Sequence, residues 1–349
     1  MNPSARVESS AISQLNTSYS YKVLEVLVEN QGVCRQADLR ETIRGSEADL
    51  EGAIQAIRRL GYPIHVDGAR SVQLRASVDV VNRRRFHEGL STEALGRHFA
   101  CHLEVGSTND LAMEAGLGGA PHGSLILAEH QIAGRGRCGK DWYSPVAVGL
   151  WFSILLRPSL SADGAWMLTL GAGVAVAEAV EAMTGLHPDL MWPNDVLLEG
   201  RKLAGILTET RLDGSNVSFA VVGIGINVAQ DVTDFPLDLR GSATSLNIVL
   251  GHPPERTVLL SRILERLESI TRSMTPERIR ALWRARSAIL GRRISVRSAD
   301  GRVEGIAEDL THDGALSVRV DEGGLASVQF GEIDEICESN ERGDDASSS

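Results

Sequence analysis

The sequence lacks an excess of basic residues. It contains 35 Lys and Arg residues against 46 Asp and Glu residues, which gives a formal net charge of -11. Nonspecific attraction to nucleic acid needs a basic surface, so this balance argues against broad nucleic-acid binding. It does not exclude one small DNA-binding module.

Closely spaced cysteines are also missing. Cys34, Cys101, Cys138 and Cys337 are far apart and form no CxxC pair. Short cysteine spacings are typical of zinc sites, and disulfide frameworks are typical of short secreted chains. The sequence therefore predicts neither feature and favours a reducing compartment.

The sequence has few long hydrophobic runs. Residues 1–14 have no apolar stretch of the signal-peptide type. The longest apolar stretch, Met167 to Met183, contains Glu178 and Glu181 and is shorter than a membrane span needs. These features predict a cytoplasmic protein that does not contact a membrane.

The N-terminal part follows a helical pattern. We expect a disordered polar tail over 1–18 and a winged helix-turn-helix domain over 19–76. Three helical segments precede a hairpin with its turn at Asp67-Gly68, and Ser46 with Asp49 has the spacing of a capping box.

The rest of the chain changes pattern twice. A connector is expected over 77–91, and 92–287 mixes strands and helices without a regular βαβ repeat. From 288 to 338, short alternating strands separated by DG and GG turns predict a small β-barrel of about five strands or fewer. A second polar tail is expected over 339–349. The fold class is therefore α+β, a mixed α/β architecture.

The segment from Gln131 to Lys140 combines three glycines, two arginines and a lysine. Glycine lets backbone N–H groups approach a phosphate, and arginine makes bidentate contacts with phosphate or carboxylate. Its G-x-G-x-x-G spacing does not indicate a dinucleotide site, because Trp142 and the following residues do not begin a helix. The alternative is a solvated basic loop. The residues are Gly134, Arg135, Gly136, Arg137, Gly139 and Lys140.

Four further segments each have a plain structural interpretation. Ser107-Thr108-Asn109 is typical of a helix cap, and Trp192-Pro193-Asn194-Asp195 is typical of a turn. Lys202 is either a solvated hairpin end or a point charge for a developing anion. The glycines of Gly223-Ile-Gly225-Ile-Asn227 indicate close approach of another backbone or a ligand.

Taken together, these segments resemble the biotin–protein ligase family, and in particular its bifunctional ligase/repressor branch. The matching text, in order, is STN at 107–109, QIAGRGRCG at 131–139, WPND at 192–195, RKLAGIL at 201–207, GIGIN at 223–227 and ATSL at 243–246. The similarity covers residues 92 to 338, and the layout of the N-terminal part matches as well.

The resemblance implies a catalytic domain related to class II aminoacyl-tRNA synthetases over 92–287 and an SH3-like domain over 288–338. It implies ATP and Mg²⁺ as cofactors and biotin as a substrate. Biotin is activated as biotinyl-5′-AMP and then transferred to a lysine of a biotin carboxyl carrier protein. It also implies a homodimer that forms on adenylate binding.

The resemblance further assigns roles to residues at matching positions. Lys202, Arg135 and Arg137 would be catalytic, and Glu332 would lie near the active site. Biotin would be bound by Ser107, Thr108, Asn109, Gln131, Arg135, Gly136, Arg137, Lys202 and Gly205. ATP or the adenylate would be bound by Gly134, Gly136, Gly139, Lys140, Trp142, Asn194, Asp195 and Asn227. No protein metal ligand is assigned beyond the Mg²⁺ that accompanies ATP.

The sequence departs from the family at several positions. Met191 stands where the family usually has a lysine. Cys138 lies within the segment from Gln131 to Lys140, the glycine–arginine loop, as a spacer or a redox-sensitive thiol. The third N-terminal helix begins with acidic residues, which would face phosphates in a DNA complex. Operator binding and a regulatory remnant both stay open. The residues that could contact DNA are Arg35, Arg40, Arg44, Ser46 and Arg70.

Three functions therefore compete. The first is a biotin–protein ligase with a biotin-dependent repressor role, and the second is a biotin-sensing repressor with weak ligase activity. The third is an enzyme of the lipoate or octanoyl transferase type, against which the GRGR sequence argues.

Overall fold

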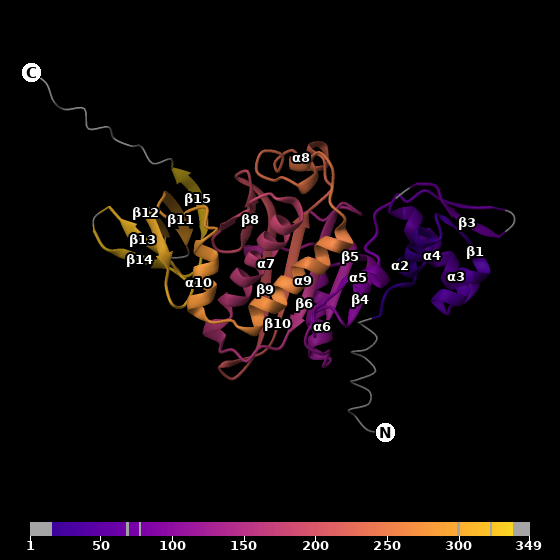
Figure 1. Ribbon diagram of the computed structural model, residues 1–349, viewed down its shortest axis with the longest axis horizontal. Coiled ribbons are helices and arrows are strands. Elements are labelled where there is room, and N and C mark those ends of the chain that lie inside the picture. Colours follow the sequence, from indigo (N-terminus) through magenta and orange to yellow (C-terminus); the bar gives the residue numbers. More distant parts are fainter. Residues whose placement is uncertain (1–15, 68–69, 77, 299–300, 322, 338–349) are drawn as a thin grey trace, which may run out of the picture.

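The computed structural model describes residues 16–67, 70–76, 78–298, 301–321 and 323–337. The described elements form three groups along the longest axis of the molecule (Figure 1). A large central sheet with helices lies between the N-terminal helices and the C-terminal strands. The order of these groups follows the order of the sequence, so the chain passes once from one end of the molecule to the other.

The N-terminal group contains three helices and a small sheet. The capping box of Ser46 and Asp49 is present at the start of the third helix, as the sequence predicts. The strand Val33–Arg35 was not predicted, because three residues are too few to show alternation. Gly68 of the predicted turn lies outside the described residues. The elements are α2 (Tyr19–Glu29), β1 (Val33–Arg35), α3 (Gln36–Ile43), α4 (Glu47–Arg59), β2 (Ile64–Val66) and β3 (Ser71–Leu74), with the sheet order β1-β3-β2.

The residues on either side of this group bind it to the central sheet. The Cys101 N–H donates to the Thr17 hydroxyl at 3.1 Å, and the Ser18 N–H donates to the Cys101 carbonyl at 3.0 Å. Thr17 and Ser18, which the sequence assigns to the N-terminal tail, are therefore fixed against the central sheet. On the other side, the helix α5 (Arg83–Gly89) lies within the predicted connector.

The central sheet has seven strands in the order β4-β5-β6-β10-β9-β8-β7. β4 and β5 run parallel and are joined through helix α6 (Thr108–Leu117), whereas the other neighbours are antiparallel. The mixed α/β class predicted from the sequence is confirmed. The strands are β4 (Phe99–Val105), β5 (Leu125–Gln131), β6 (Gly149–Leu156), β7 (Asp189–Met191), β8 (Asp195–Leu198), β9 (Arg201–Asp213) and β10 (Asn216–Asn227).

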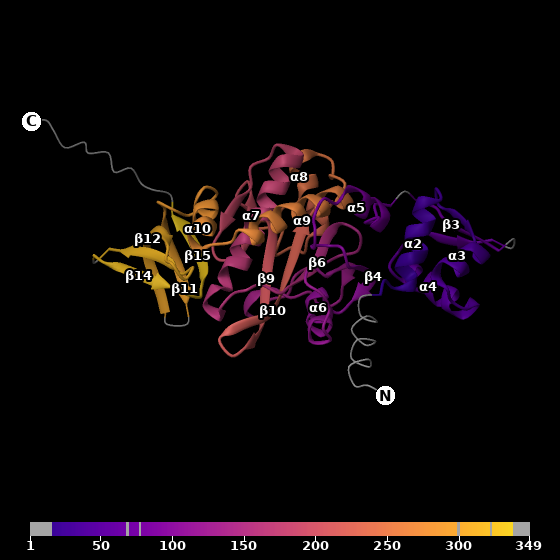
Figure 2. The same ribbon diagram turned by 60° about the horizontal axis from the view of Figure 1, so that its bottom comes forward.

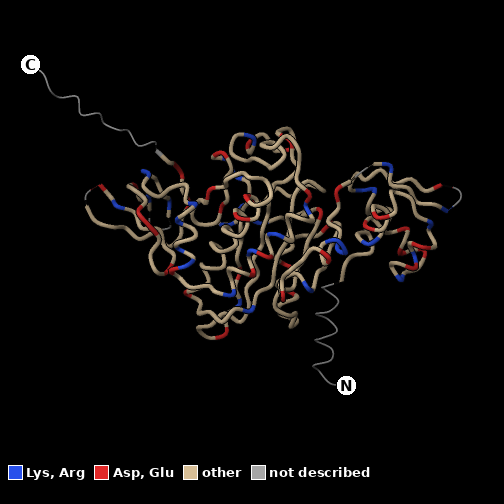
Figure 3. The backbone as a smooth tube through the Cα atoms, viewed as in Figure 1, with Lys and Arg blue, Asp and Glu red and all other residues tan. Residues whose placement is uncertain are grey.

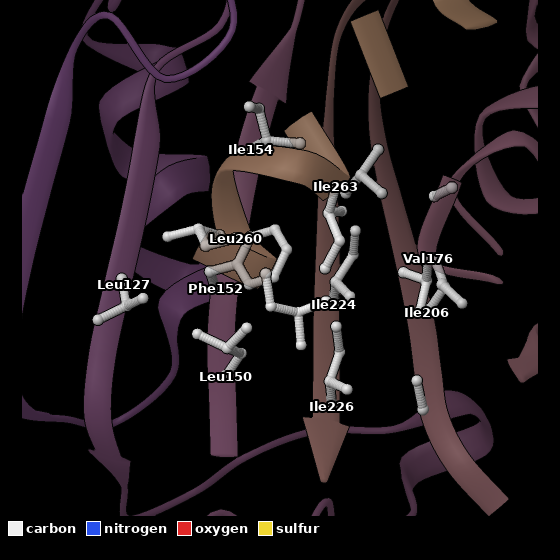
Figure 4. Packing of buried hydrophobic residues seen from close by; sticks show 14 of the residues in the cluster. Leu127, Leu150, Phe152, Ile154, Val176, Ile206, Ile224, Ile226, Leu260 and Ile263 are labelled. Atoms are coloured by element: carbon white, nitrogen blue, oxygen red, sulfur yellow. The ribbon is translucent and has the colours of Figure 1, made fainter. Parts of the chain in front are cut away.

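Both faces of this sheet are covered by helices. Successive residues of a strand point to opposite faces, so Val222 and Ile224 pack with α7 and α9 while Val221 packs with α6. Figure 4 shows Ile224 of β10 near Ile263 of α9. The remaining helices of this group are α7 (Trp166–Thr184), α8 (Leu246–Leu250), α9 (Arg256–Arg272) and α10 (Pro276–Arg284).

Helix α7 and the residues before it form a helical stretch that is longer than the apolar stretch from Met167 to Met183. The helical stretch Ala162–Thr184 has 23 residues and a mean hydropathy of 1.3, so by length and composition alone it could cross a membrane. The expectation that this region is too short for a span was therefore wrong. Within its most apolar window, 67% is buried by the protein itself. The apolar composition is accounted for by packing inside the central layer.

The C-terminal group is a five-stranded antiparallel sheet (Figure 2). Five strands is the upper limit of the sequence-based expectation. The Trp192 indole N–H donates to the Gly314 carbonyl at 3.2 Å, which joins this sheet to the central one. The strands are β11 (Arg293–Ser298), β12 (Gly301–Leu310), β13 (Leu316–Val320), β14 (Leu325–Val328) and β15 (Glu332–Cys337), in the order β14-β13-β12-β11-β15.

Replacing Gly314 should weaken this junction. Gly314 has φ +80°, and a Cβ there would lie 2.4 Å from the Trp166 ring, so Gly314→Ala combines backbone strain with overpacking. We expect a loss of roughly 2–4 kcal/mol in the free energy of unfolding. Gly323→Ala is the matched control, because Gly323 has φ +83° with no atom near its Cβ position. Denaturant unfolding that gives equal losses for both variants would contradict the packing argument.

Candidate functional site

A cavity of about 460 Å³ lies where the glycine–arginine loop crosses β9 and β10. Its walls come from the start of α6, the loop after β5, the turn before β8 and the segment Gly331–Ile333 next to β15. The residues singled out from the sequence that line it are Ser107, Thr108, Asn109, Gln131, Arg135, Gly136, Arg137, Cys138, Lys140, Trp142, Met191, Asn194, Asp195, Lys202, Gly205, Asn227 and Glu332. Segments separated by up to 225 residues therefore meet at one cavity.

The floor of the cavity is made by glycines. Gly223 and Gly225 lie on one face of β10, and Gly225 pairs with Gly205 of β9. A Cβ at Gly225 would lie 2.3 Å from the Trp142 indole nitrogen, and one at Gly223 would lie 2.1 Å from the Asn109 amide oxygen. The missing side chains are thus what let an aromatic ring and a polar side chain lie directly on the sheet.

One end of the cavity is a polar network. Ser153 donates to the Asn109 amide oxygen at 2.6 Å, and the Asn109 amide donates to Glu209 at 2.8 Å. The Thr108 N–H donates to the Gln131 amide oxygen at 2.8 Å. Gln131, rather than Ser107, therefore caps this N–H of α6. Ser107 occupies the N-cap position of α6, as the helix-cap interpretation predicts, but its side chain makes no capping hydrogen bond and lines the cavity.

The other end is positively charged. The Lys202 ammonium lies 2.7 Å from the Asp195 carboxylate and 5.4 Å from the centre of a Trp142 ring. Arg137 donates to the Asn194 side-chain oxygen and to the Gly331 carbonyl, both at 3.4 Å. Arg137 and Lys202 line the same cavity, as a shared site for an acid and a nucleotide requires.

Arg135 is paired with two carboxylates at the rim of the cavity. Its guanidinium donates to Asp110 at 2.6 Å and to Glu209 at 2.9 Å, and its side chain is 42% exposed. Because arginine forms strong charge-assisted bonds with any nearby carboxylate, these two acids hold it at the rim of the cavity. An anionic ligand would have to compete with them.

Gly134 and Gly139 do not belong to the cavity lining. A Cβ at Gly134 would lie 2.5 Å from the Trp142 carbonyl oxygen, so this glycine allows close packing within the loop. Gly139 has φ +72° and follows Cys138, which has φ +56°. Cys138 and Gly139 turn the chain, and the Cys138 side chain is exposed.

The C-terminal group contributes an acid to the same cavity. Glu332 forms an ion pair with Lys140 of the loop, and Arg297 lies 3.6 Å from the Glu332 carboxylate. The hydrogen bond from Lys140 holds the pKa of Glu332 below its ordinary value, and the charges of Lys140, Arg297 and Lys202 add to this effect. The carboxylate thus stays ionised and connects β15 to the loop.

Two asparagines are held by backbone contacts. The Asn194 amide donates to the Ile206 carbonyl at 2.9 Å, which fixes the turn before β8 against β9. The Asn227 amide donates to the Lys202 carbonyl at 3.4 Å, and its oxygen accepts from Gln230 at 3.0 Å. Both side chains line the cavity while holding its walls together.

Several cavity residues were not found from the sequence as site residues. They include hydrophobic residues of the segment after β10. Glu209 of β9 lies outside the lining and bonds Asn109 and Arg135, which belong to it. The Lys202 N–H donates to the Ser242 carbonyl at 2.8 Å, which brings that segment beside the lysine. The spacing of residues along the sequence does not predict such contacts. The additional lining residues are Asp141, Tyr143, Phe152, Trp192, Pro193, Leu197, Gly200, Ile206, Leu207, Phe235, Leu239, Ser242, Ala243, Gly331 and Ile333.

The residues considered for DNA contact lie in the N-terminal group, outside the cavity lining. Arg35 bonds Asp38 at 2.8 Å, and Ser46 bonds Asp49 within the capping box. Arg40 and Arg44 lie at the end of α3. Figure 3 shows acidic positions interspersed with the basic ones along the backbone of this group.

Comparisons with known proteins place this architecture in a class. Residues 104–227 match the Biotin/lipoate A/B protein ligase family, and residues 289–334 match the Biotin protein ligase C terminal domain. The chain is 34% identical to the Bifunctional ligase/repressor BirA of Bacillus subtilis (strain 168) over 275 residues, which are 77% of this chain and 84% of that relative.

Two further relatives agree with this class. The Biotin--[acetyl-CoA-carboxylase] ligase of Mycobacterium tuberculosis is 38% identical over 226 residues, 62% of this chain and 81% of that protein. The structure of the biotin protein ligase from Aquifex aeolicus in complex with biotin and ATP is 29% identical and aligns with a TM-score of 0.57, covering 71% of this chain and 100% of that chain. The chain belongs to the biotin protein ligase family.

The ion pair between Lys140 and Glu332 should make stability depend on pH. The folded-state pKa of Glu332 lies below its ordinary value of 4.5, so the stabilisation is present above pH 4.5 and is lost as pH falls through the lowered pKa. Both side chains are largely exposed, so we expect about 1 kcal/mol or less. Thermal unfolding of the wild type and Glu332→Gln between pH 3 and pH 7 measures it.

Glu335→Gln is the control, because Glu335 approaches Arg302 of its own sheet at 4.0 Å and does not line the cavity. A difference between wild type and Glu332→Gln that stays constant across this pH range would contradict the assignment.

Proposed function

We propose that this protein is an ATP-dependent biotin–protein ligase. In the first half-reaction, a biotin carboxylate oxygen attacks the α-phosphorus of ATP, and pyrophosphate leaves. In the second, a lysine amine of a biotin carboxyl carrier protein attacks the carboxyl carbon of biotinyl-5′-AMP, and AMP leaves with the bonding electron pair. The observation that supports this most is the cavity with Arg137 and Lys202 at one end and a polar network at the other.

The polarity of the cavity suggests the orientation of biotin. The ureido ring needs neutral donors and acceptors, which Ser107, Asn109 and Gln131 supply at the polar end. The valerate chain would cross the glycine floor, and its carboxylate would reach Lys202 and Arg137. This places the one charged group of biotin beside the cations.

The same geometry accounts for rate enhancement by charge and position. Negative charge accumulates on the carboxylate and α-phosphate oxygens during attack, and a fixed ammonium and guanidinium stabilise it. Arg137 belongs to a loop and Lys202 to a strand, so the two cations can approach the reacting centre from different sides. Correct alignment of two bound reactants is itself a large contribution.

The nucleotide would occupy the wall beyond the glycine floor. The Trp142 ring, which lies on Gly205 and Gly225, suits an adenine or ribose face, and Asn227 offers an amide for the adenine edge. The Trp142 indole nitrogen is buried without a hydrogen-bond partner among the described residues. A ligand acceptor would satisfy it.

Magnesium fits this site as a companion of ATP. The Asp195 Oδ1 atom is buried and has no hydrogen-bond partner among the described residues, and Mg²⁺ is commonly held by one or two carboxylates together with substrate phosphates. Within the described part of the chain, no group of three His, Cys, Asp or Glu side chains could hold a metal ion. The ion would neutralise phosphate charge, while Asp195 keeps the Lys202 ammonium in place.

The outer groups suggest the finer architecture. The five antiparallel strands of 288–338 support an SH3-like domain, and the three helices with a small sheet in 19–76 support a winged helix-turn-helix domain. A connector over 77–91 and the catalytic domain over 92–287 complete the proposed division. We place the acceptor carrier protein at the open mouth of the cavity and propose that adenylate binding promotes a homodimer.

A repressor role is the second candidate function. It is favoured by the N-terminal group and by relatives from Bacillus subtilis and Escherichia coli that are named ligase/repressor. It is opposed by Glu47, Asp49 and Glu51 at the start of α4, because acids there would meet DNA phosphates. A lipoate or octanoyl transferase is disfavoured, since the C-terminal match and the relatives are biotin-specific by name.

Adenylation should depend strongly on Lys202. We expect Lys202→Ala to lower the rate of biotinyl-AMP formation on the order of 10²–10³-fold, because it removes the charge nearest the proposed reacting centre. Purified protein is mixed with biotin, ATP and Mg²⁺, and biotinyl-AMP and labelled carrier are quantified. Arg201→Ala is the matched control, because Arg201 precedes Lys202 but does not line the cavity. Equal rates for the wild type and Lys202→Ala would reject the proposed site.

DNA binding by the N-terminal group is tested separately. Fluorescence anisotropy of the organism's own biotin-operon promoter is measured with and without biotin and ATP. If the repressor role holds, Arg35→Ala should weaken promoter binding several-fold, because one phosphate contact is lost, while biotinyl-AMP formation stays unchanged. Absence of a specific, biotin-dependent signal for the wild type would end the repressor proposal and leave the ligase untouched.

A further inference from the structure

Arg256 is buried at a place where neither helix stability nor core packing calls for a cation. It is the first residue of α9, and its side chain is 1% exposed. The helix dipole opposes positive charge at a helix N-terminus, and a buried charge is costly unless it is fully partnered. A specific set of partners must therefore account for this residue.

The first partners flank residues 132–148, the segment between β5 and β6 that contains the glycine–arginine loop. One terminal nitrogen of Arg256, Nη1, donates to the Glu129 carboxylate at 2.8 Å and to the Gly149 carbonyl at 2.8 Å. Glu129 lies near the end of β5, before the loop, and Gly149 begins β6, after it. One nitrogen thus joins both stems of the loop that carries Arg137 and Trp142 to the cavity.

The second partners belong to the N-terminal side. The Arg256 Nε donates to the Asp79 carboxylate at 3.0 Å, and Nη2 donates to the Asp79 carbonyl. The Tyr21 hydroxyl of α2 donates to the Val81 carbonyl at 2.7 Å and to Glu129 at 3.4 Å. Burial raises the pKa of Tyr21, so its hydroxyl stays protonated as a donor.

We propose that Arg256 is a positioning residue for the adenylation reaction. It holds the stems of the glycine–arginine loop at a fixed separation and ties them to the connector and to α2 of the N-terminal group. This inference rests on the proposed ligase function. Since none of Arg256, Glu129, Asp79 and Tyr21 lines the cavity, their effect on the reaction runs through the loop.

A direct test weakens the Arg256 brace, which is the set of hydrogen bonds from Arg256 to Glu129, Gly149 and Asp79. Arg256→Lys keeps the positive charge but cannot reach all the partners of Arg256. Asp79→Asn removes only the negative charge of Asp79, a connector residue whose side chain is 44% exposed. For both we expect a KM for biotin raised roughly three- to tenfold, because small displacements of positioned groups are costly. Trypsin cleavage after Arg135, Arg137 or Lys140, measured without substrates, should accelerate by a similar factor.

Glu25→Gln is the matched control. Glu25 binds Arg83 of the same connector at 2.6 Å but does not contact Arg256, so its replacement loosens the N-terminal junction without touching the brace. It should leave the KM for biotin and the loop cleavage rate unchanged. Thermal unfolding monitors the folded state of each variant, and if Arg256→Lys does not fold, Asp79→Asn decides the outcome.

Wild-type values of KM and loop cleavage in a folded Asp79→Asn variant would overturn the proposal, as would equal effects of Asp79→Asn and Glu25→Gln. A wild-type protein that forms no biotinyl-AMP would refute the proposed ligase function, whereas the cleavage assay would still report on the loop without any substrate.

Discussion

The site depends on the absence of side chains along one face of β9 and β10. Gly205, Gly223 and Gly225 leave the backbone bare, and the space above them is taken by Trp142, by Asn109 and by the open cavity. Neighbouring residues on the opposite face are large and aliphatic and pack against α9. One strand thus anchors the hydrophobic core and shapes the cavity, because its side chains alternate between the two faces.

Three of the cations that line the cavity are each held by an acid, whereas Arg137 is held by the Asn194 side-chain oxygen and the Gly331 carbonyl. Lys202 is paired with Asp195, Arg135 with Asp110 and Glu209, and Lys140 with Glu332. Such pairing keeps long side chains ordered where positive charge is concentrated, and an anionic ligand can replace a carboxylate as the partner. The arrangement agrees with a reaction whose reactants carry negative charge, and it explains why the sequence needs no acid–base triad.

Most helices and long strands could be predicted, since they depend on periodicity within a few residues. The capping box at Ser46 is an example. Short elements such as β1 and β7 could not, because three residues carry no pattern. The missing capping hydrogen bond of Ser107 could not be predicted for a different reason. Whether its hydroxyl caps α6 depends on Gln131, which lies on another strand.

By itself, the sequence determined the family, the chemistry of the loop and the glycines that a bare strand face requires, since these are properties of local residue order. Only the tertiary structure decided which groups share the cavity. The segment around Ser242 reaches it beside Lys202, and Glu209 bonds the lining residue Arg135 from outside the cavity. Gly134 and Gly139 lie outside the lining. The Arg256 brace is of the second kind, because its partners are more than 100 residues away along the chain and meet only through folding.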